Sequence, residues 1–389
     1  MIAARTEADV LDAVRDAREH RRTLEIVGAG TKRPFGRVTQ CDDVLDVTGL
    51  SGVVSYEPEE LILTVKAGTP VANITALLQS KNQRLGFEPA DWGPLLDAPA
   101  NKATIGGVLS ADACGPAAVR YSRARDSLLG YRAVNGLGEA YKAGGKVVKN
   151  VTGFDLPKLM CGAMGTLGVL TEVTLRLYPK PSDTATLIVR DVSPQEGFAA
   201  LRTIWSSPLE ATGLSYCPSR TAIAGLGDIG RGAALIRLEG APEPLREKIE
   251  GATALLGSKI ESTVETDVFD DVANAKIFAA QDLDVWRVFV PPADAAMGIG
   301  KIQPPSWFAD WAGGLLWVGM LPGNDGARLR ELIAPFGGHA TLVKSSEATR
   351  RRVDVFQPEP PARAALTKAV KAAFDPLGIF NPGRMWEGV

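Results

Sequence analysis

A glycine-rich loop near the N-terminus has the composition of an anion-binding site. Residues 26–36 read as a strand followed by the loop Gly28, Ala29, Gly30, Thr31 and Lys32. Glycine lets consecutive backbone N–H groups turn toward a ligand at close range, and such amides form a concavity suited to diphosphate oxygens. The loop therefore suits a nucleotide diphosphate, although a tight turn between two strands would have the same composition.

The loop does not match the common fingerprints of nucleotide-binding folds. A Rossmann fingerprint needs a third glycine and a helix that opens beside it. Here Arg33 stands in the place of that glycine, Pro34 follows, and the next residues are β-rich. The sequence also lacks a Walker A motif. NAD binding in the Rossmann mode is therefore disfavoured.

Two further glycine-rich segments could approach a ligand closely. In residues 98–116 the candidates are Thr104, Gly106 and Gly107. In residues 149–181 three glycines are spaced three positions apart, and the candidates are Gly162, Gly165, Thr166 and Gly168. Glycine also permits close packing of a neighbouring helix, so each segment alone has two interpretations. Three such loops in one domain indicate an extended cofactor that contacts all of them.

These loops lie in a part of the chain that alternates strands, turns and helices. The apolar residues of segment 7–21 have helical spacing, and Pro70 begins a second helix predicted over 71–81. At 389 residues the chain exceeds what one hydrophobic core usually serves, so two domains are expected. We predict that residues 1–181 form the first, cofactor-binding domain.

The rest of the chain has a different pattern. From residue 182 to 345 the order strand, helix, strand recurs, which resembles two split βαβ units that share an antiparallel sheet. We therefore predict an α+β second domain over 182–345. The last residues, 374–389, are too apolar for a loose tail and contain prolines and glycines that exclude a long helix there. We therefore predict that the C-terminal segment, 346–389, packs back on the first domain.

Composition narrows the kinds of partner. The chain carries 43 basic and 45 acidic residues, so neither nucleic acid nor a polybasic membrane contact is expected. Its four cysteines are scattered without metal-ligand spacing and read as free thiols, and no metal site is predicted. The N-terminus lacks the apolar core of a signal peptide, and no apolar stretch is long enough to span a bilayer. We expect a cytoplasmic protein without direct membrane insertion, for which any attachment to the inner membrane would be made through partners.

Taken in order, several motifs resemble one known family. The segments "GAGTKRPFG", "ATIGG", "SRARDSLLGYRAVNGLGE", "KNVTGFDLPKLMCGAMGTLGVLTEVTLRLYPKP" and "FDPLGIFNPGRM" are similar to FAD-binding oxidoreductases of the vanillyl-alcohol oxidase type. More closely, "GFEPADWGPLL", "GGKVVKNVTGFDL", "WRVFVPP" and "GGHATLVKSSE" resemble the FAD-binding subunits of bacterial glycolate oxidases. The resemblance covers nearly the whole chain and implies a two-domain FAD-binding fold with an antiparallel-sheet second domain.

The resemblance also implies roles for particular residues. Loop 28–32 would hold the FAD diphosphate, helped by Thr104, Ile105, Gly106 and Gly107. The flavin would be wrapped by Asn150, Gly153, Gly165, Thr166, Gly168 and Val169. Pro89 would line the same cleft, and Asp126 of the Arg125–Asp126 pair would either contact FAD or brace the fold. Family members that tether FAD covalently use histidine or cysteine in the cofactor loops, whereas this chain has only His20 and His339, so FAD is predicted to be non-covalent.

Oxidation of a 2-hydroxy acid needs a cation for the carboxylate and a group that takes the hydroxyl proton. His339 is the candidate base, because histidine changes its charge near neutral pH. Arg287, on a predicted strand, could bind a carboxylate in a bidentate manner. Each has a structural alternative: a histidine at a strand end often only supports the fold, and Arg287 could stack on Trp311 or Trp317.

The main hypothesis follows from the resemblance. It implies a small 2-hydroxy acid substrate and two partners, a catalytic flavoprotein subunit and an iron–sulfur subunit of glycolate oxidase. Related catalytic flavoproteins carry several histidines and often a metal site in the second domain, whereas this chain has one histidine there. We therefore predict a non-autonomous FAD-binding subunit that oxidises glycolate to glyoxylate together with its partners. The alternatives are a stand-alone FAD-dependent dehydrogenase that uses His339 and Arg287, and a flavin-free assembly scaffold.

Overall fold

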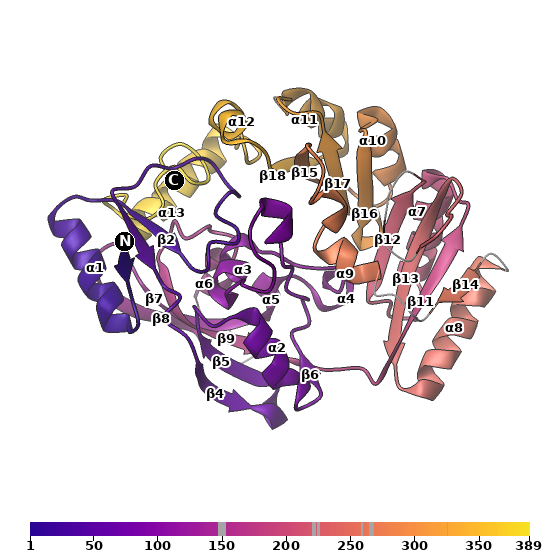
Figure 1. The fold of residues 1–389 in the computed structure, drawn as a ribbon, viewed down its shortest axis with the longest axis horizontal. Helices are drawn as coiled ribbons and strands as arrows, with labels where there is room; N and C mark the ends of the chain where they lie inside the picture. Colours follow the sequence, from indigo (N-terminus) through magenta and orange to yellow (C-terminus); the bar gives the residue numbers. More distant parts are fainter. Residues whose placement is uncertain (147–152, 220–222, 224–225, 258–259, 264–267, 325) are drawn as a thin grey trace. The chain divides into compact units, whose positions relative to one another are not determined.

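The chain divides into two compact units (Figure 1). The first consists of Met1–Cys114, Arg123–Pro179 and Pro358–Val389, and the second of Gly115–Ser122 and Lys180–Gln357. The structure is a computed structural model, and it describes residues 1–146, 153–219, 223, 226–257, 260–263, 268–324 and 326–389. None of the described helices is both long and apolar enough to cross a membrane.

These divisions shift the predicted boundary after residue 181 by two residues, to Pro179, and differ from the prediction at two further places. Residues 346–357 group with the second unit, where Arg330 Nη2 donates to the carbonyl of Phe356 at 3.1 Å. Segment 115–122 also belongs to the second unit, since Trp311 Nε1 donates to the carbonyl of its first residue at 3.2 Å. Contacts far apart in the sequence decide both assignments, which explains why local patterns did not indicate them.

In the described part of the first unit the chain forms three small sheets and short helices. Its strands are β1 (Ile2–Ala3), β2 (Leu24–Val27), β3 (Asp43–Asp46), β4 (Val53–Glu57), β5 (Ile62–Lys66), β6 (Gln83–Arg84), β7 (Leu128–Val134), β8 (Ala140–Gly144), β9 (Val169–Arg176) and β10 (Tyr178–Pro179). Its helices are α1 (Glu7–Glu19), α2 (Val71–Gln79), α3 (Ile105–Ala111), α5 (Ala124–Ser127), α6 (Leu156–Met160) and α13 (Pro361–Phe374).

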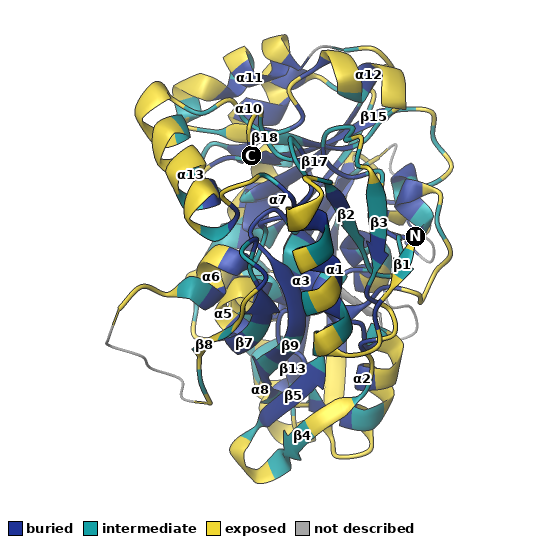
Figure 2. Ribbon diagram, turned by 90° about the vertical axis from the view of Figure 1, so that its left-hand side faces the viewer, coloured by how far each residue is buried: buried dark blue, intermediate teal, exposed yellow. Residues whose placement is uncertain are grey.

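The sheets of the first unit have different topologies. The order β1-β3-β2 is parallel, the order β4-β5-β9-β7-β8 is antiparallel, and β10 pairs with β6. The central strands β7 and β9 are largely buried, while the edge strand β4 is partly exposed (Figure 2). The parallel strand β2 ends at Val27, and the glycine loop begins directly after it.

The predicted N-terminal helix is confirmed as α1. Thr6 and Asp9 form a capping box at its start, which satisfies backbone N–H groups that the first turn leaves open. The buried face of α1 includes Val10 and Val14, which belong to one apolar cluster with Leu24 and other residues of β2, β3 and the C-terminal segment. Burial of this face positions β2 and therefore the loop that follows it. The helix predicted over 71–81 is likewise present as α2.

The described residues of the second unit form an eight-stranded antiparallel sheet. Its strands are β11 (Asp183–Arg190), β12 (Gly213–Pro218), β13 (Gly232–Gly240), β14 (Ile260–Thr263), β15 (Asp284–Phe289), β16 (Ser306–Asp310), β17 (Leu315–Met320) and β18 (His339–Lys344). Its helices are α4 (Ala118–Tyr121), α7 (Pro194–Trp205), α8 (Pro242–Leu256), α9 (Val268–Ala273), α10 (Ala295–Ile302), α11 (Ala327–Ile333) and α12 (Glu347–Arg352).

The predicted pair of split βαβ units is present in this sheet. The strand order is β14-β11-β13-β12-β16-β17-β15-β18, so each half places its four strands in the same sequence when read outward from the β12–β16 junction. The first half carries α7 and α8, and the second carries α10 and α11 at the equivalent places in the chain. Apolar side chains from both halves form one continuous core.

Candidate cofactor-binding site

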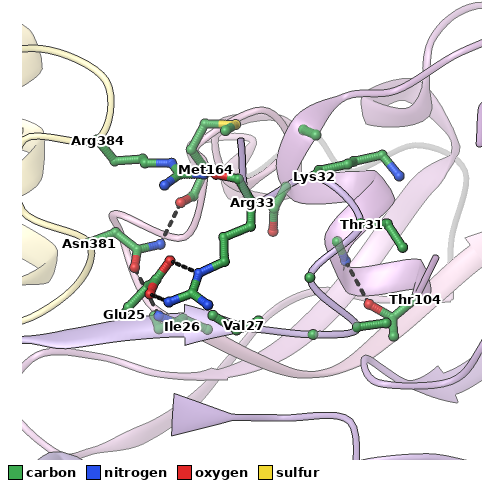
Figure 3. A pocket seen from close by; sticks show the side chains of 16 residues that line it. Glu25, Ile26, Val27, Thr31, Lys32, Arg33, Thr104, Met164, Asn381 and Arg384 are labelled. Atoms are coloured by element: carbon green, nitrogen blue, oxygen red, sulfur yellow. Dashed lines mark hydrogen bonds and ion pairs between the residues drawn. The ribbon is translucent and has the colours of Figure 1, made fainter. Parts of the chain in front are cut away.

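The glycine loop after β2 lines a pocket in the first unit (Figure 3). Gly30 has φ +72°, a left-handed conformation that residues with a Cβ rarely adopt, so glycine is required at this position. The loop is closed by two turns, in which Arg33 N donates to Gly30 O and Phe35 N donates to Lys32 O, both at 3.0 Å. The pocket is lined by Glu25, Ile26, Val27, Gly28, Ala29, Gly30, Thr31, Lys32, Arg33, Thr104, Gly107, Ser110, Ala111, Met164, Asn381 and Arg384.

The second glycine segment meets the first at Thr104. Its hydroxyl accepts a hydrogen bond from Gly107 N at 3.3 Å and caps the start of α3. A Cβ on Gly28 would lie 2.5 Å from the same hydroxyl oxygen, so glycine allows the loop to approach α3 this closely. Thr104 and Gly107 line the pocket. Ile105 is fully buried, and Gly106 N donates to Ala67 O at 2.8 Å, which indicates a packing role for both.

Lys32 is the most unusual group in this pocket. The residue is 8% exposed, and its Nζ has no hydrogen-bond partner among the described residues. Desolvation lowers the pKa of Lys32 to about 8, while the charge of Asp91 partly opposes this shift. A buried ammonium without an acceptor is unfavourable, and diphosphate oxygens would supply that acceptor. The loop amides and this cation therefore fit the diphosphate of a dinucleotide such as FAD.

The other charged groups of the pocket already have partners. Arg33 Nε donates to Glu25 Oε1 at 2.8 Å, and a second bond joins the other ends of the same two side chains. Arg384 Nη2 donates to two backbone carbonyls of the loop region, Arg33 O at 2.5 Å and Phe35 O at 2.6 Å. Lys32 therefore contributes the charge that a ligand anion would meet.

The depressed pKa of Lys32 predicts an unusual pH dependence. An unfolded lysine titrates near pH ~10.4, so between about pH 8 and that value the unfolded chain binds more protons than the folded FAD-free chain. The free energy of unfolding of the FAD-free chain should therefore rise with pH across this window. FAD affinity should fall over the same window, by at most about tenfold per pH unit, because a single ammonium is lost.

Thermal unfolding and FAD titrations from about pH 7 to about pH 9.5 check both slopes. The variant Lys32→Met isolates the contribution of this one group. In the variant, the free energy of unfolding should rise less with pH than in the wild type, and FAD affinity should fall less with pH. Identical pH profiles in the two proteins would show that Lys32 does not titrate in this range.

The third glycine segment contributes one wall of the pocket and several packing contacts. Met164 lines the pocket, and a Cβ on Gly165, which has φ +71°, would lie 2.7 Å from Asn381 Nδ2. Thr166 is buried, and its hydroxyl donates to Ala163 O at 2.8 Å. Two further predicted residues also support packing. A Cβ added at Gly168 would lie 3.0 Å from a carbonyl of β7, and Val169 is buried at the start of β9.

The remaining residues predicted to contact the cofactor are not among those that line the pocket. Pro89 forms an isolated bridge with Cys114, and Gly153 is exposed with φ +80°. Asp126 lies in α5, where its carboxylate accepts from Arg123 N at 3.3 Å and lies 3.9 Å from a lysine of α6, so bracing of the fold is the better supported of its two roles. Asn150 lies outside the described residues.

The two residues proposed for catalysis lie on paired strands of the second unit. His339 begins β18 and is exposed, and its ring stacks on Phe289 of β15 with a centroid distance of 4.7 Å. Arg287 is 4% exposed, and its Cζ lies 5.1 Å from the Phe289 ring, 5.8 Å from Trp311 and 5.5 Å from Trp317. Stacking on aromatic rings was the structural alternative for Arg287, and this geometry favours it.

Sequence reasoning missed several residues of the pocket. Ser110 and Ala111 come from the end of α3, Met164 from the third glycine segment, and Asn381 and Arg384 from the C-terminal segment. Asn381 and Arg384 could have been found from the sequence, because they are polar residues in an otherwise apolar segment that was expected to pack back on the first domain.

The pocket and the fold together define the class of protein. A family model described as an FAD binding domain matches residues 1–144, which include the glycine loop, Thr104 and α3. Among solved structures, p-cresol methylhydroxylase superposes with a TM-score of 0.71 at 18% identity, covering 98% of this chain and 87% of that one. The chain thus contains an FAD-binding domain, and the predicted two-domain fold class and FAD cofactor are confirmed.

A closer relationship follows from the full-length relatives. Glycolate oxidase subunit GlcE of Escherichia coli (strain K12) is 31% identical over 378 residues, which covers 97% of this chain and 96% of that protein. Glycolate oxidase subunit GlcD of Bacillus subtilis (strain 168) is 22% identical over 99% of this chain and 88% of its own length. The chain therefore belongs to the family of the GlcE subunit.

Proposed function

We propose that this chain is the FAD-binding subunit of a glycolate oxidase, which oxidises glycolate to glyoxylate. The observation that carries the proposal is the match to the Escherichia coli subunit at 31% identity over 97% of this chain. The pocket after β2 supports it, because the Lys32 ammonium is buried there without a hydrogen-bond partner among the described residues. The diphosphate of an anionic cofactor would supply the hydrogen-bond acceptor that this ammonium lacks.

Each part of the pocket has a separate task. The backbone amides of loop 28–33 bind the diphosphate, and the Lys32 ammonium neutralises part of its charge. Thr104 holds the start of α3 against Gly28 and so fixes the shape of the loop. FAD, when bound, accepts the two electrons that leave the alcohol carbon of the substrate. Because no cysteine or histidine lines the pocket among the described residues, we propose non-covalent binding.

We further propose that partner subunits complete the chemistry on the 2-hydroxy acid. They would be a catalytic flavoprotein subunit and an iron–sulfur subunit. The positions of the candidate catalytic groups support this division: Arg287 lies buried among aromatic rings, and His339 stacks on Phe289. The other histidine, His20, follows α1 and contacts Asp16 at the surface. A partner would then supply the proton acceptor and the carboxylate-binding cation.

An anaerobic absorbance titration tests this proposal. The purified chain, loaded with FAD, is mixed with glycolate and separately with D-lactate. We expect a flavin spectrum that stays oxidised with the chain alone and bleaches when the partner subunits are added, because the groups that activate the substrate would come from the partners.

The same titration distinguishes the alternatives. Bleaching by glycolate without any partner would establish a stand-alone dehydrogenase, and His339→Ala would then be the first variant to make. Failure to bind FAD at all would leave the scaffold alternative. Acid precipitation of the loaded protein serves as a control for attachment: flavin in the supernatant indicates non-covalent binding, and flavin in the pellet contradicts it.

A further inference from the structure

A buried ion pair within the C-terminal segment holds that segment against the third glycine segment, because its lysine also donates to a backbone carbonyl there. Lys371 is the only buried residue of α13, which is otherwise largely exposed. Its Nζ donates to Asp375 Oδ2 at 2.7 Å, to Thr166 O at 2.7 Å and to Phe380 O at 2.9 Å. The Asp375 carboxylate in turn accepts from Ile379 N at 2.9 Å and Phe380 N at 2.8 Å. This pair fixes the path of the chain toward the pocket.

Directly after this anchor, Asn381 bridges two walls of the pocket. Its Oδ1 accepts from Ile26 N of β2 at 2.9 Å, and its Nδ2 donates to Met164 O at 2.7 Å (Figure 3). Asn381 is 5% exposed, so both bonds are shielded from water. The oxygen and the nitrogen of the Asn381 side-chain amide are therefore both needed to join β2, which precedes the glycine loop, to the third glycine segment.

Arg384 holds the far end of the same loop. Its Nη2 donates to Arg33 O and Phe35 O, and its own carbonyl accepts from Arg37 N at 2.9 Å. Gly36 has φ +102°, and a Cβ there would lie 2.7 Å from Arg384 Nε, so the arginine packs directly on the loop backbone. Asn381 and Arg384 thus fix the loop at both its ends.

We propose that Asn381 and Arg384 are positioning residues for FAD, which hold the glycine loop in its anion-binding shape and couple docking of the C-terminal segment to occupancy of the pocket. The inference rests on the proposed binding of the FAD diphosphate at this loop. Coupling between two events is reciprocal, so FAD must stabilise the docked C-terminal segment as much as that segment stabilises FAD binding.

The variant Asn381→Asp tests the first half of this coupling. The carboxylate keeps the acceptor for Ile26 N, but it loses the donor to Met164 O and adds a negative charge to a pocket that should bind an anion. We expect the FAD dissociation constant to rise about 10- to 100-fold. The matched control is Asn73→Asp, the same chemical change at an exposed position of α2, which should leave FAD affinity as in the wild type.

Hydrogen exchange of the wild-type chain tests the second half without any substitution. With saturating FAD, exchange should slow at the amides of Ile26, Arg37 and the non-proline residues of 377–389 relative to the FAD-free chain. Amides of α8 in the second unit serve as the reference. Unchanged exchange in the C-terminal segment would overturn the proposal, as would wild-type FAD affinity in folded Asn381→Asp. If the wild type itself binds no FAD, the proposed function fails instead, and the two failures are thus distinguished.

Discussion

Replacing Lys32 by methionine should make the FAD-free chain more stable and at the same time weaken FAD binding. Methionine has nearly the same length but no charge, so it removes a buried ammonium that has no hydrogen-bond partner among the described residues. Loss of that desolvation penalty should raise the free energy of unfolding by about 1–3 kcal/mol. Loss of a charged hydrogen bond to the diphosphate should cost about 1.5–3 kcal/mol of binding, or about a 10- to 150-fold higher dissociation constant.

Two measurements on the same preparation check this prediction. Denaturant unfolding of the FAD-free protein gives the stability, and fluorescence titration with FAD gives the affinity. Lys81→Met is the control, because Lys81 is exposed just after α2 and its substitution should change neither quantity. A variant of Lys32 that loses stability and affinity together would show that the lysine supports the fold and does not serve the ligand.

The opposite signs matter because they separate binding from structure. A residue that only supports packing stabilises the folded chain, so its removal lowers the free energy of unfolding. A residue retained for a ligand is tolerated at a cost in the ligand-free protein, and the ligand offsets that cost. The pair of charges Lys371 and Asp375 shows the contrast within the same unit, since each has hydrogen-bond partners in the FAD-free chain.

The sequence predicted the glycine loop and the repeated topology of the second unit, because both depend on local patterns. The glycine-rich loop 28–32 and the strand before it are recognisable from residue type and order. The alternation of strands and helices likewise indicated two split βαβ units. The order of the eight strands was not predictable in this way, because the junction between β12 and β16 joins residues far apart in the chain.

Other features of the site depend on contacts that no local pattern contains. The glycines of the loops look alike in the sequence, yet Gly28 lines the pocket whereas Gly106 serves the approach of α3 to Ala67. The burial of Lys32 is a property of the assembled pocket, since an isolated Thr-Lys-Arg run reads as a solvated turn. Asn381 reaches the site from 355 positions beyond Ile26, the residue whose amide it accepts from.

Substitution of Gly28 by alanine should damage FAD binding through one identifiable contact. The new Cβ would lie 2.5 Å from Thr104 Oγ1, closer than such atoms approach in proteins. The chain can escape only if Thr104 gives up its bond to Gly107 N or if the loop moves away from α3 and loses its aligned amides. Such overpacking typically costs about 1–3 kcal/mol, so we expect FAD affinity about 5- to 150-fold below that of the wild type.

The double variant Gly28→Ala, Thr104→Ala tests this cause directly. A Cβ at position 28 would lie 3.5 Å from the Thr104 Cβ, which is ordinary contact, so removal of the hydroxyl should relieve the overlap and restore most of the affinity. Thr104→Ala alone should cost about 1 kcal/mol of stability through loss of the helix cap, and Gly300→Ala, in open space on α10, is the glycine control. Strong coupling between the two substitutions would show that the loop must lie against α3 to bind FAD, whereas additive losses would show that Gly28 acts independently of Thr104.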